Sequence, residues 1–95
     1  MMVAAAITPD SVPALRRGVR RQFDRTRNSA ILMAPERVIV LDEIADSIIE
    51  SFKPAATVRD IVAGLATRFG APAQEIEDDV IAFILELNDK GLVVL

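Results

Sequence analysis

Residues 28–52 read NSAILMAPERVIVLDEIADSIIESF, and the change of pattern within them decides the fold class. Apolar runs lie on both sides of Pro35, and the second is rich in β-branched residues, which predicts two short strands. Pro35 has the fixed φ that suits the second position of a turn, so the two strands are expected to form a hairpin. After Asp42 the apolar residues recur with helical spacing, and Asp42 itself can cap the helix. This stretch therefore predicts a hairpin that leads directly into a helix.

Working outward, one more strand is predicted before the hairpin and two more helices after it. The expected strands cover residues 19–24, 28–34 and 37–41, with a short terminal strand at 92–95. The expected helices cover residues 42–53, 57–70 and 73–90, with capping residues at the first two starts and glycines at the last two ends. The order predicts an α+β, winged-helix-like fold, in which an N-terminal three-stranded antiparallel β-sheet packs on three α-helices.

The length of 95 residues limits the chain to one small domain. Residues 1–14 contain Pro9 and Pro13 and show no apolar periodicity, which indicates a flexible N-terminal tail or linker. Residues 15–95 are expected to form the folded domain.

The composition removes most of the usual enzyme chemistry. The chain has no cysteine and no histidine, which excludes thiolate metal sites, cysteine nucleophiles and imidazole bases. Paired acids stand at Asp42-Glu43 and within residues 77–79, where helix capping and the helix dipole explain them. We therefore expect a non-catalytic binding protein without a metal or cofactor. No apolar run approaches the ~20 residues of a membrane span, so no membrane contact and a cytoplasmic location are expected.

Charge is distributed unevenly along the chain. Residues 16–37 contain seven arginines and two acidic residues, whereas residues 38–95 contain four basic and eleven acidic residues. Solvated arginines on an exposed hairpin would explain the basic segment without any function. Separated charge can also orient a binding partner. On that interpretation, contact with a partner protein or with acidic peptide residues is expected at Arg16, Arg17, Arg20 and Arg21.

Two elements carry more apolar surface than one core needs. In the helix over residues 73–90, Ile81 and Leu85 extend the apolar arc to roughly half of the circumference. In the strand over residues 37–41, apolar side chains point to both faces. Internal packing or a dimer contact would cover this surface. Alternatively, a groove between the strand edge and the helix could accept an extended peptide as an added strand.

Two other classes of function stay open at this stage. A winged helix with an arginine-rich hairpin is a common DNA-binding arrangement, although Lys90 is the only basic residue of the third helix and the pI is about 4.8. A self-associating structural domain could pair its exposed strand edge with another copy. The peptide hypothesis differs from both because it needs neither a basic reading helix nor a second copy.

Four segments, taken in order and spacing, resemble the PqqD family of pyrroloquinoline quinone (PQQ) biosynthesis proteins. They are RRGVRRQFD at residues 16–24, AILMAPE at 30–36, VLDEIA at 40–45 and DVIAFI at 79–84. The resemblance covers about residues 15–95. The chain departs from the family pattern at the turn glycine, which is Arg37 here, and at the capping asparagine, which is Asp42.

The resemblance implies a winged-helix recognition element for a ribosomally made and post-translationally modified peptide (RiPP). Such a module binds the precursor peptide PqqA and presents it to the radical S-adenosylmethionine (SAM) enzyme PqqE, which cross-links a Glu and a Tyr. Related domains bind the leader peptide as a strand between their third strand and third helix. The resulting prediction is a monomer or weak homodimer with a peptide site at Arg37, Val38, Ile39, Val40, Leu41, Ile81, Leu85 and Asn88.

Overall fold

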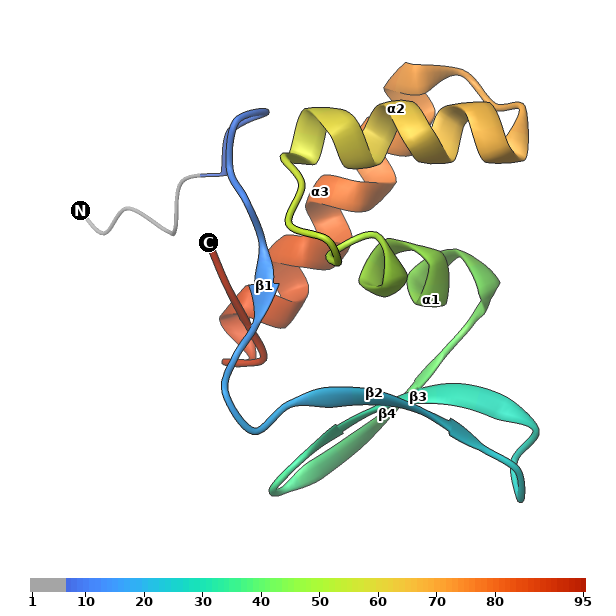
Figure 1. Cartoon of the computed structure of the whole chain (residues 1–95), viewed down its shortest axis with the longest axis vertical. Coiled ribbons are helices and arrows are strands. Elements are labelled where there is room, and N and C mark those ends of the chain that lie inside the picture. Colours follow the sequence, from blue (N-terminus) through green and yellow to red (C-terminus); the bar gives the residue numbers. More distant parts are fainter. Residues whose placement is uncertain (1–6) are drawn as a thin grey trace.

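The computed structural model describes residues 7–95, which form an α+β domain with the helices on one side of a small sheet (Figure 1). The strands are β1 (Ala14–Leu15), β2 (Arg20–Asp24), β3 (Ser29–Ala34), β4 (Arg37–Leu41) and β5 (Val93–Val94). The helices are α1 (Glu43–Glu50), α2 (Val58–Phe69) and α3 (Ala73–Asp89). The predicted fold class is confirmed, and each predicted strand and helix is present within a few residues of its expected range.

The three-stranded sheet has the order β2-β3-β4 and is antiparallel throughout. Ala34 pairs with Arg37, so Pro35 and Glu36 form the two-residue turn of the predicted hairpin. The turn between β2 and β3 contains Asn28 with φ of 54°, a left-handed conformation that asparagine tolerates better than most residues. Because β3 is central, β2 and β4 are the two edges of this sheet.

The starts of α1 and α2 and the end of α2 fall at the residues that the sequence indicates, whereas α1 ends at Glu50, three residues before the expected end at residue 53. The Asp42 carboxylate accepts a hydrogen bond from the Ala45 backbone N–H at 2.8 Å, and the Thr57 hydroxyl accepts one from Asp60 N–H at 3.1 Å. These bonds satisfy backbone donors that the first helical turn leaves free. Gly70 ends α2 with φ of 61°, the left-handed conformation that favours glycine after a helix.

The core lies between the inner face of the sheet and the three helices. The inner face contributes Ala30, Leu32 and Leu41, all buried. The helices contribute one apolar side each, and the buried residues are Ile48, Ile49, Val58, Ile61, Val62, Leu65, Ile76, Val80, Ile84 and Leu87. This packing fixes α3 relative to the sheet, because both contribute to the same cluster.

The N-terminal segment differs from the expected tail or linker. The Pro9 and Ser11 carbonyls each accept a hydrogen bond of 2.9 Å from the first turn of α2, and Pro13 is fully buried. Next, β1 pairs with β5 in a second, two-stranded antiparallel sheet. Pro9, Ser11, Pro13 and Ala14 thus hydrogen-bond or pack on the folded domain, and residues 1–6 lie outside the described residues. A two-residue strand that pairs with the far end of the chain leaves no periodic signal in the sequence.

Candidate functional site

The edge strand β4 leaves part of its backbone without a partner. A two-residue turn closes on a hydrogen-bonded pair, here Ala34 with Arg37, and hydrogen-bonded pairs then alternate along the hairpin. The register therefore turns the backbone N–H and C=O groups of Val38 and Val40 away from β3. In residues 7–95, no backbone hydrogen bond outside the sheet reaches either residue. The edge of β4 can thus accept another strand.

The side chains of β4 alternate between the two faces of the sheet. Val38 and Val40 point to the outer face and are 47% and 55% exposed. Leu41 is buried on the inner face, and Ile39 is half-buried there and packs against the core cluster. The sequence left open which face of this strand turns outward. The structure shows that Val38 and Val40 form the outward face.

The predicted residues of α3 lie on one flank of that helix, because their spacing of four and three residues brings them to the same side. Ile81 is half-buried and packs against the core. Leu85 is also half-buried, but it is not among the side chains that pack on the core cluster. The Asn88 side chain donates a hydrogen bond of 2.9 Å to the Val93 carbonyl, so it holds the turn between α3 and β5.

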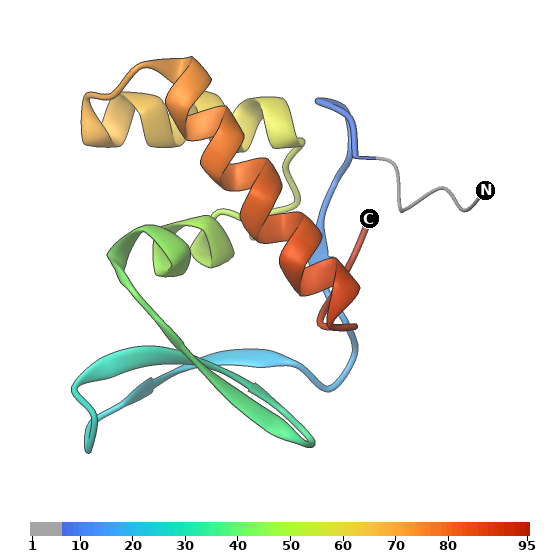
Figure 2. The same ribbon diagram turned by 180° about the vertical axis from the view of Figure 1, so that it is seen from behind.

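The strand and helix parts of the predicted site lie on the same side of the molecule. Figure 2 shows both β4 and α3 toward the viewer, with the C-terminal half of α3 above the hairpin of β3 and β4. The three clefts that we identify in the described residues include no residue of α3, and Leu41 is the one predicted β4 residue among their linings. The predicted site is therefore described as a free strand edge beside a half-exposed helix flank.

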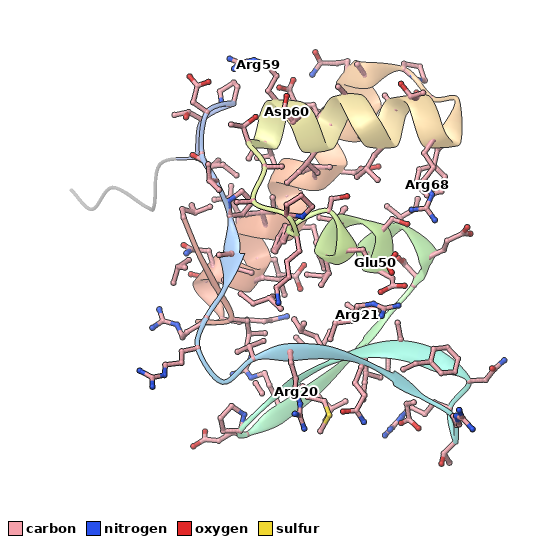
Figure 3. All side chains as sticks on the ribbon, viewed as in Figure 1. Arg20, Arg21, Glu50, Arg59, Asp60 and Arg68 are labelled. Carbon is pink, nitrogen blue, oxygen red and sulfur yellow. The ribbon has the colours of Figure 1, made fainter. Side chains whose placement is uncertain are left out.

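The four predicted arginines fall into two groups. Arg21 points to the inner side of the sheet, where Figure 3 shows it directed toward Glu50 of α1. Its guanidinium forms a two-bond ion pair with Asp46, including an Nη2–Oδ2 distance of 2.9 Å, and lies 3.5 Å from Glu50. The hydrogen bond to Asp46 raises the pKa of Arg21 above its ordinary value. Arg21 therefore attaches the sheet to α1.

Arg16, Arg17 and Arg20 are exposed, and no salt bridge of the described residues involves them. Figure 3 shows Arg20 pointing to the side of the sheet opposite Arg21. All four positions border one cleft of about 430 Å³, together with Lys53 from the segment after α1, although the Arg20 side chain points to the other side of the sheet. Sequence reasoning did not include Lys53, because only the folded chain brings residue 53 next to residues 16–21.

Within residues 7–95, no group of three or more potential metal-ligating side chains occurs, and none of the helices is long and apolar enough to span a membrane. Asp42 caps α1 and Glu43 lies in its first turn, as expected, whereas the acidic residues 77–79 lie one turn further into α3, beyond Glu75 of its first turn.

Comparison with protein families connects this geometry to a known group. The family model described as "Coenzyme PQQ synthesis protein D (PqqD)" matches residues 29–93, which include β3, β4 and all three helices. The chain belongs to the PqqD family. The resemblance found in the four sequence segments is thereby confirmed.

Relatives of the chain within the PqqD family carry a more specific description. A "PqqA binding protein" from Xanthomonas campestris pv. campestris strain B100 is 46% identical over 88 residues, which is 93% of this chain and 96% of the relative. A protein of the same description from Xanthomonas oryzae pv. oryzae strain KACC10331 is 47% identical with the same coverage.

Two solved structures of the PqqD family are similar to this fold. The solution NMR structure of the PqqD truncation of Methylobacterium extorquens PqqCD is described as a functional, stand-alone RiPP recognition element. It has a TM-score of 0.83 at 33% identity, covering 95% of this chain and 96% of that one. The crystal structure of PqqD from Xanthomonas campestris has a TM-score of 0.59 at 44% identity, with coverage of 95% and 100%. Both support the α+β architecture described above.

Proposed function

We propose that this member of the PqqD family is a non-catalytic adaptor of PQQ biosynthesis that binds the precursor peptide PqqA and presents it to the radical SAM enzyme PqqE. The observation that carries the proposal is the free edge of β4 beside the α3 flank, in a chain whose relatives are described as PqqA binding proteins. Adaptor and enzyme would meet in the cytoplasm, and the adaptor would act as a monomer or weak homodimer.

Peptide binding follows from the chemistry of the strand edge. The outward N–H and C=O groups of Val38 and Val40 would pair with an extended peptide, which gives affinity with little demand on its sequence. Alternate peptide side chains would then point toward the helices, into the space beside Ile39, Ile81 and Leu85. A half-buried apolar flank suits such side chains because their burial removes apolar surface from water.

The non-catalytic role is supported by the composition. The whole chain contains no histidine or cysteine, so the common groups for proton transfer and nucleophilic attack near neutral pH are missing. The chemistry on the peptide would then belong to PqqE, and this chain would supply recognition and placement of the substrate.

An NMR titration of the labelled protein with synthetic PqqA tests the proposal first. We expect amide shifts concentrated on residues 37–42 and 76–89, with no shifts when a short DNA duplex replaces the peptide. Shifts confined to other regions would contradict the site, and an unchanged spectrum would contradict peptide binding itself.

A proline substitution in β4 tests whether the peptide pairs with this strand through main-chain hydrogen bonds. Val40→Pro removes one outward N–H donor, and proline is tolerated where the edge N–H faces solvent. We expect Val40→Pro to weaken PqqA binding at least tenfold by calorimetry, whereas the matched Val40→Ala variant keeps the donor and most of the affinity. Equal affinities of the two variants would exclude main-chain pairing at Val40. Light scattering of the free protein shows whether a second copy occupies the same edge instead.

A further inference from the structure

The cleft between the basic segment 16–21 and the C-terminal end of α1 is not part of the peptide site. Its charged lining residues include Arg16, Arg17, Arg21 and Lys53, with Glu50. Arg20 also borders the cleft, but its side chain points to the opposite side of the sheet (Figure 3). The whole chain has a net charge of −3, so the cleft is a positively charged region of an otherwise acidic protein. Arg21 is paired with Asp46 and Glu50, whereas Arg16, Arg17 and Lys53 take part in no salt bridge among residues 7–95.

The cleft also has an apolar floor. Val19, Ile49 and Phe52 are buried residues of the core, and they line the cleft together with half-buried Leu15. The volume of about 430 Å³ is within the range of specific binding sites. Neighbouring cations that repel each other do not stabilise the fold, but they favour an incoming anionic group. The combination of apolar floor and cationic rim suits a polypeptide segment that carries both apolar and acidic residues.

Its position separates this cleft from the predicted peptide groove. The basic segment leads into β2, and β2 and β4 are opposite edges of the sheet. β4 and α3 face the viewer in Figure 2, whereas the start of β2 lies toward the viewer in Figure 1. A peptide added to β4 would therefore leave the cleft accessible.

We propose that this cleft docks an acidic segment of the enzyme that modifies the bound peptide, so that peptide and enzyme occupy opposite edges of one sheet. The identity of the partner rests on the proposed function, whereas the charge preference of the cleft does not. Arg16, Arg17 and Lys53 are the contact residues. Arg21 is excluded because its guanidinium holds the sheet to α1, and Arg20 because its side chain points to the opposite side of the sheet.

A nucleic acid fits the cleft less well than an acidic polypeptide. Glu50 lies in the wall, Asp46 lies next to it on α1, and residues 38–95 carry a strong excess of acids that would repel a phosphate backbone. The one aromatic side chain of the lining, Phe52, is buried and offers no exposed face for base stacking.

The test compares two double charge reversals of equal size. Arg16→Glu/Arg17→Glu changes the cleft, and the control Arg25→Glu/Arg68→Glu changes two exposed arginines of the β2–β3 turn and of α2. Binding of each full-length variant to PqqE and, separately, to PqqA is measured at low salt. We expect the cleft variant to lose at least tenfold in affinity for PqqE and less than twofold for PqqA. The control should stay within twofold for both.

The outcomes distinguish this inference from the proposed function. Wild-type affinity for PqqE from the cleft variant, or equal losses in both variants, would overturn the docking site even if PqqA binds normally. Failure of the wild-type protein to bind PqqA would refute the proposed function. The PqqE affinities of the cleft variant and the control variant would still test the docking site in that case. If the wild-type and control proteins bound a DNA duplex and the cleft variant did not, a nucleic acid would replace an acidic polypeptide as the partner of the cleft. Weakening of wild-type PqqE binding as salt is raised, with a smaller effect in the cleft variant, supports the docking site.

Discussion

The two sides of α3 are both apolar but differ in burial. On the core side, Ile76, Val80, Ile84 and Leu87 are almost completely buried in the core, where α3 packs on α2 and β5. On the open side, Ile81 and Leu85 are equally apolar but only half-buried. The apolar arc is thus wider than the core uses, and α3 itself lies on the same side of the molecule as β4 (Figure 2).

This difference in burial predicts which substitutions in α3 should change the free energy of unfolding and which should change peptide affinity. A buried side chain contributes mainly to the free energy of unfolding, because its removal leaves a cavity. A half-exposed apolar side chain beside a binding surface contributes mainly to affinity, because ligand binding completes its burial. The predictions below use this contrast, beginning with the largest expected effect.

Ile84→Ala should lower the free energy of unfolding by about 2–5 kcal/mol, because Ile84 is 0% exposed and its truncation leaves a cavity in the core. The neighbouring variant Leu85→Ala should cost at least about 1 kcal/mol less, since this side chain does not pack on the core cluster. Urea denaturation of both variants measures the contrast. Equal destabilisation would mean that the two sides of α3 contribute alike to the fold.

The core side of α3 could be predicted from the sequence because helix periodicity and the capping residues are local signals. The same holds for β4, whose observed bounds of Arg37–Leu41 match the predicted strand. Pairing of β1 with β5 could not be predicted, since each strand is two residues long and the partners are at opposite ends of the chain.

For the candidate site, the sequence could not predict the contacts of single side chains. Arg20 and Arg21 look equivalent in the sequence, but strand alternation sends them to opposite sides of the sheet, and only Arg21 meets the carboxylates of α1. Asn88 looked like a groove residue, yet its partner is a carbonyl brought close by the turn after α3. Both distinctions depend on tertiary contacts that no local pattern encodes.

Leu85→Asp should weaken PqqA binding by more than about 1 kcal/mol while the protein stays folded, because an apolar anchor of the open side is replaced by a charge. Calorimetry gives the affinity, and circular dichroism confirms the fold. The matched control is Ala82→Asp, which introduces the same residue at an exposed position of α3 away from this flank. If Ala82→Asp weakened binding as much, the effect would belong to the charge of the helix and not to the open side.

Asn88→Ala should reduce the free energy of unfolding by about 1 kcal/mol, because the Val93 carbonyl loses its side-chain donor. Thermal denaturation measures the loss, and Asp89→Ala at the exposed neighbouring position is the control. Amide exchange in β5 should also become faster, since this bond holds the turn. If Asn88→Ala left the stability unchanged and weakened PqqA binding, Asn88 would be a peptide contact and not a structural residue.

The smallest expected effect lies away from α3, at the turn between β2 and β3, and it provides a control for the whole comparison. Hydrogen bonds from the Arg27 side chain, and from the Thr26 and Arg27 backbone N–H groups, lower the pKa of Asp24 below its ordinary value. A lowered folded-state pKa means that Asp24 contributes stability above its unfolded pKa of about 3.9. That contribution is lost as the pH falls below this value and through the folded pKa.

Denaturation at pH values between neutral and about 3 should therefore show a smaller acid-induced loss for Asp24→Asn than for the wild-type protein. The difference should be modest, because the ion pair with Arg27 is open to solvent. Asp24→Asn should leave PqqA affinity at neutral pH unchanged, since neither side of α3 contacts this turn through any salt bridge or side-chain hydrogen bond of Asp24. A marked loss of PqqA affinity in this variant would show that the peptide site extends along the sheet to the turn between β2 and β3. The open side of α3 would then be only one part of the site.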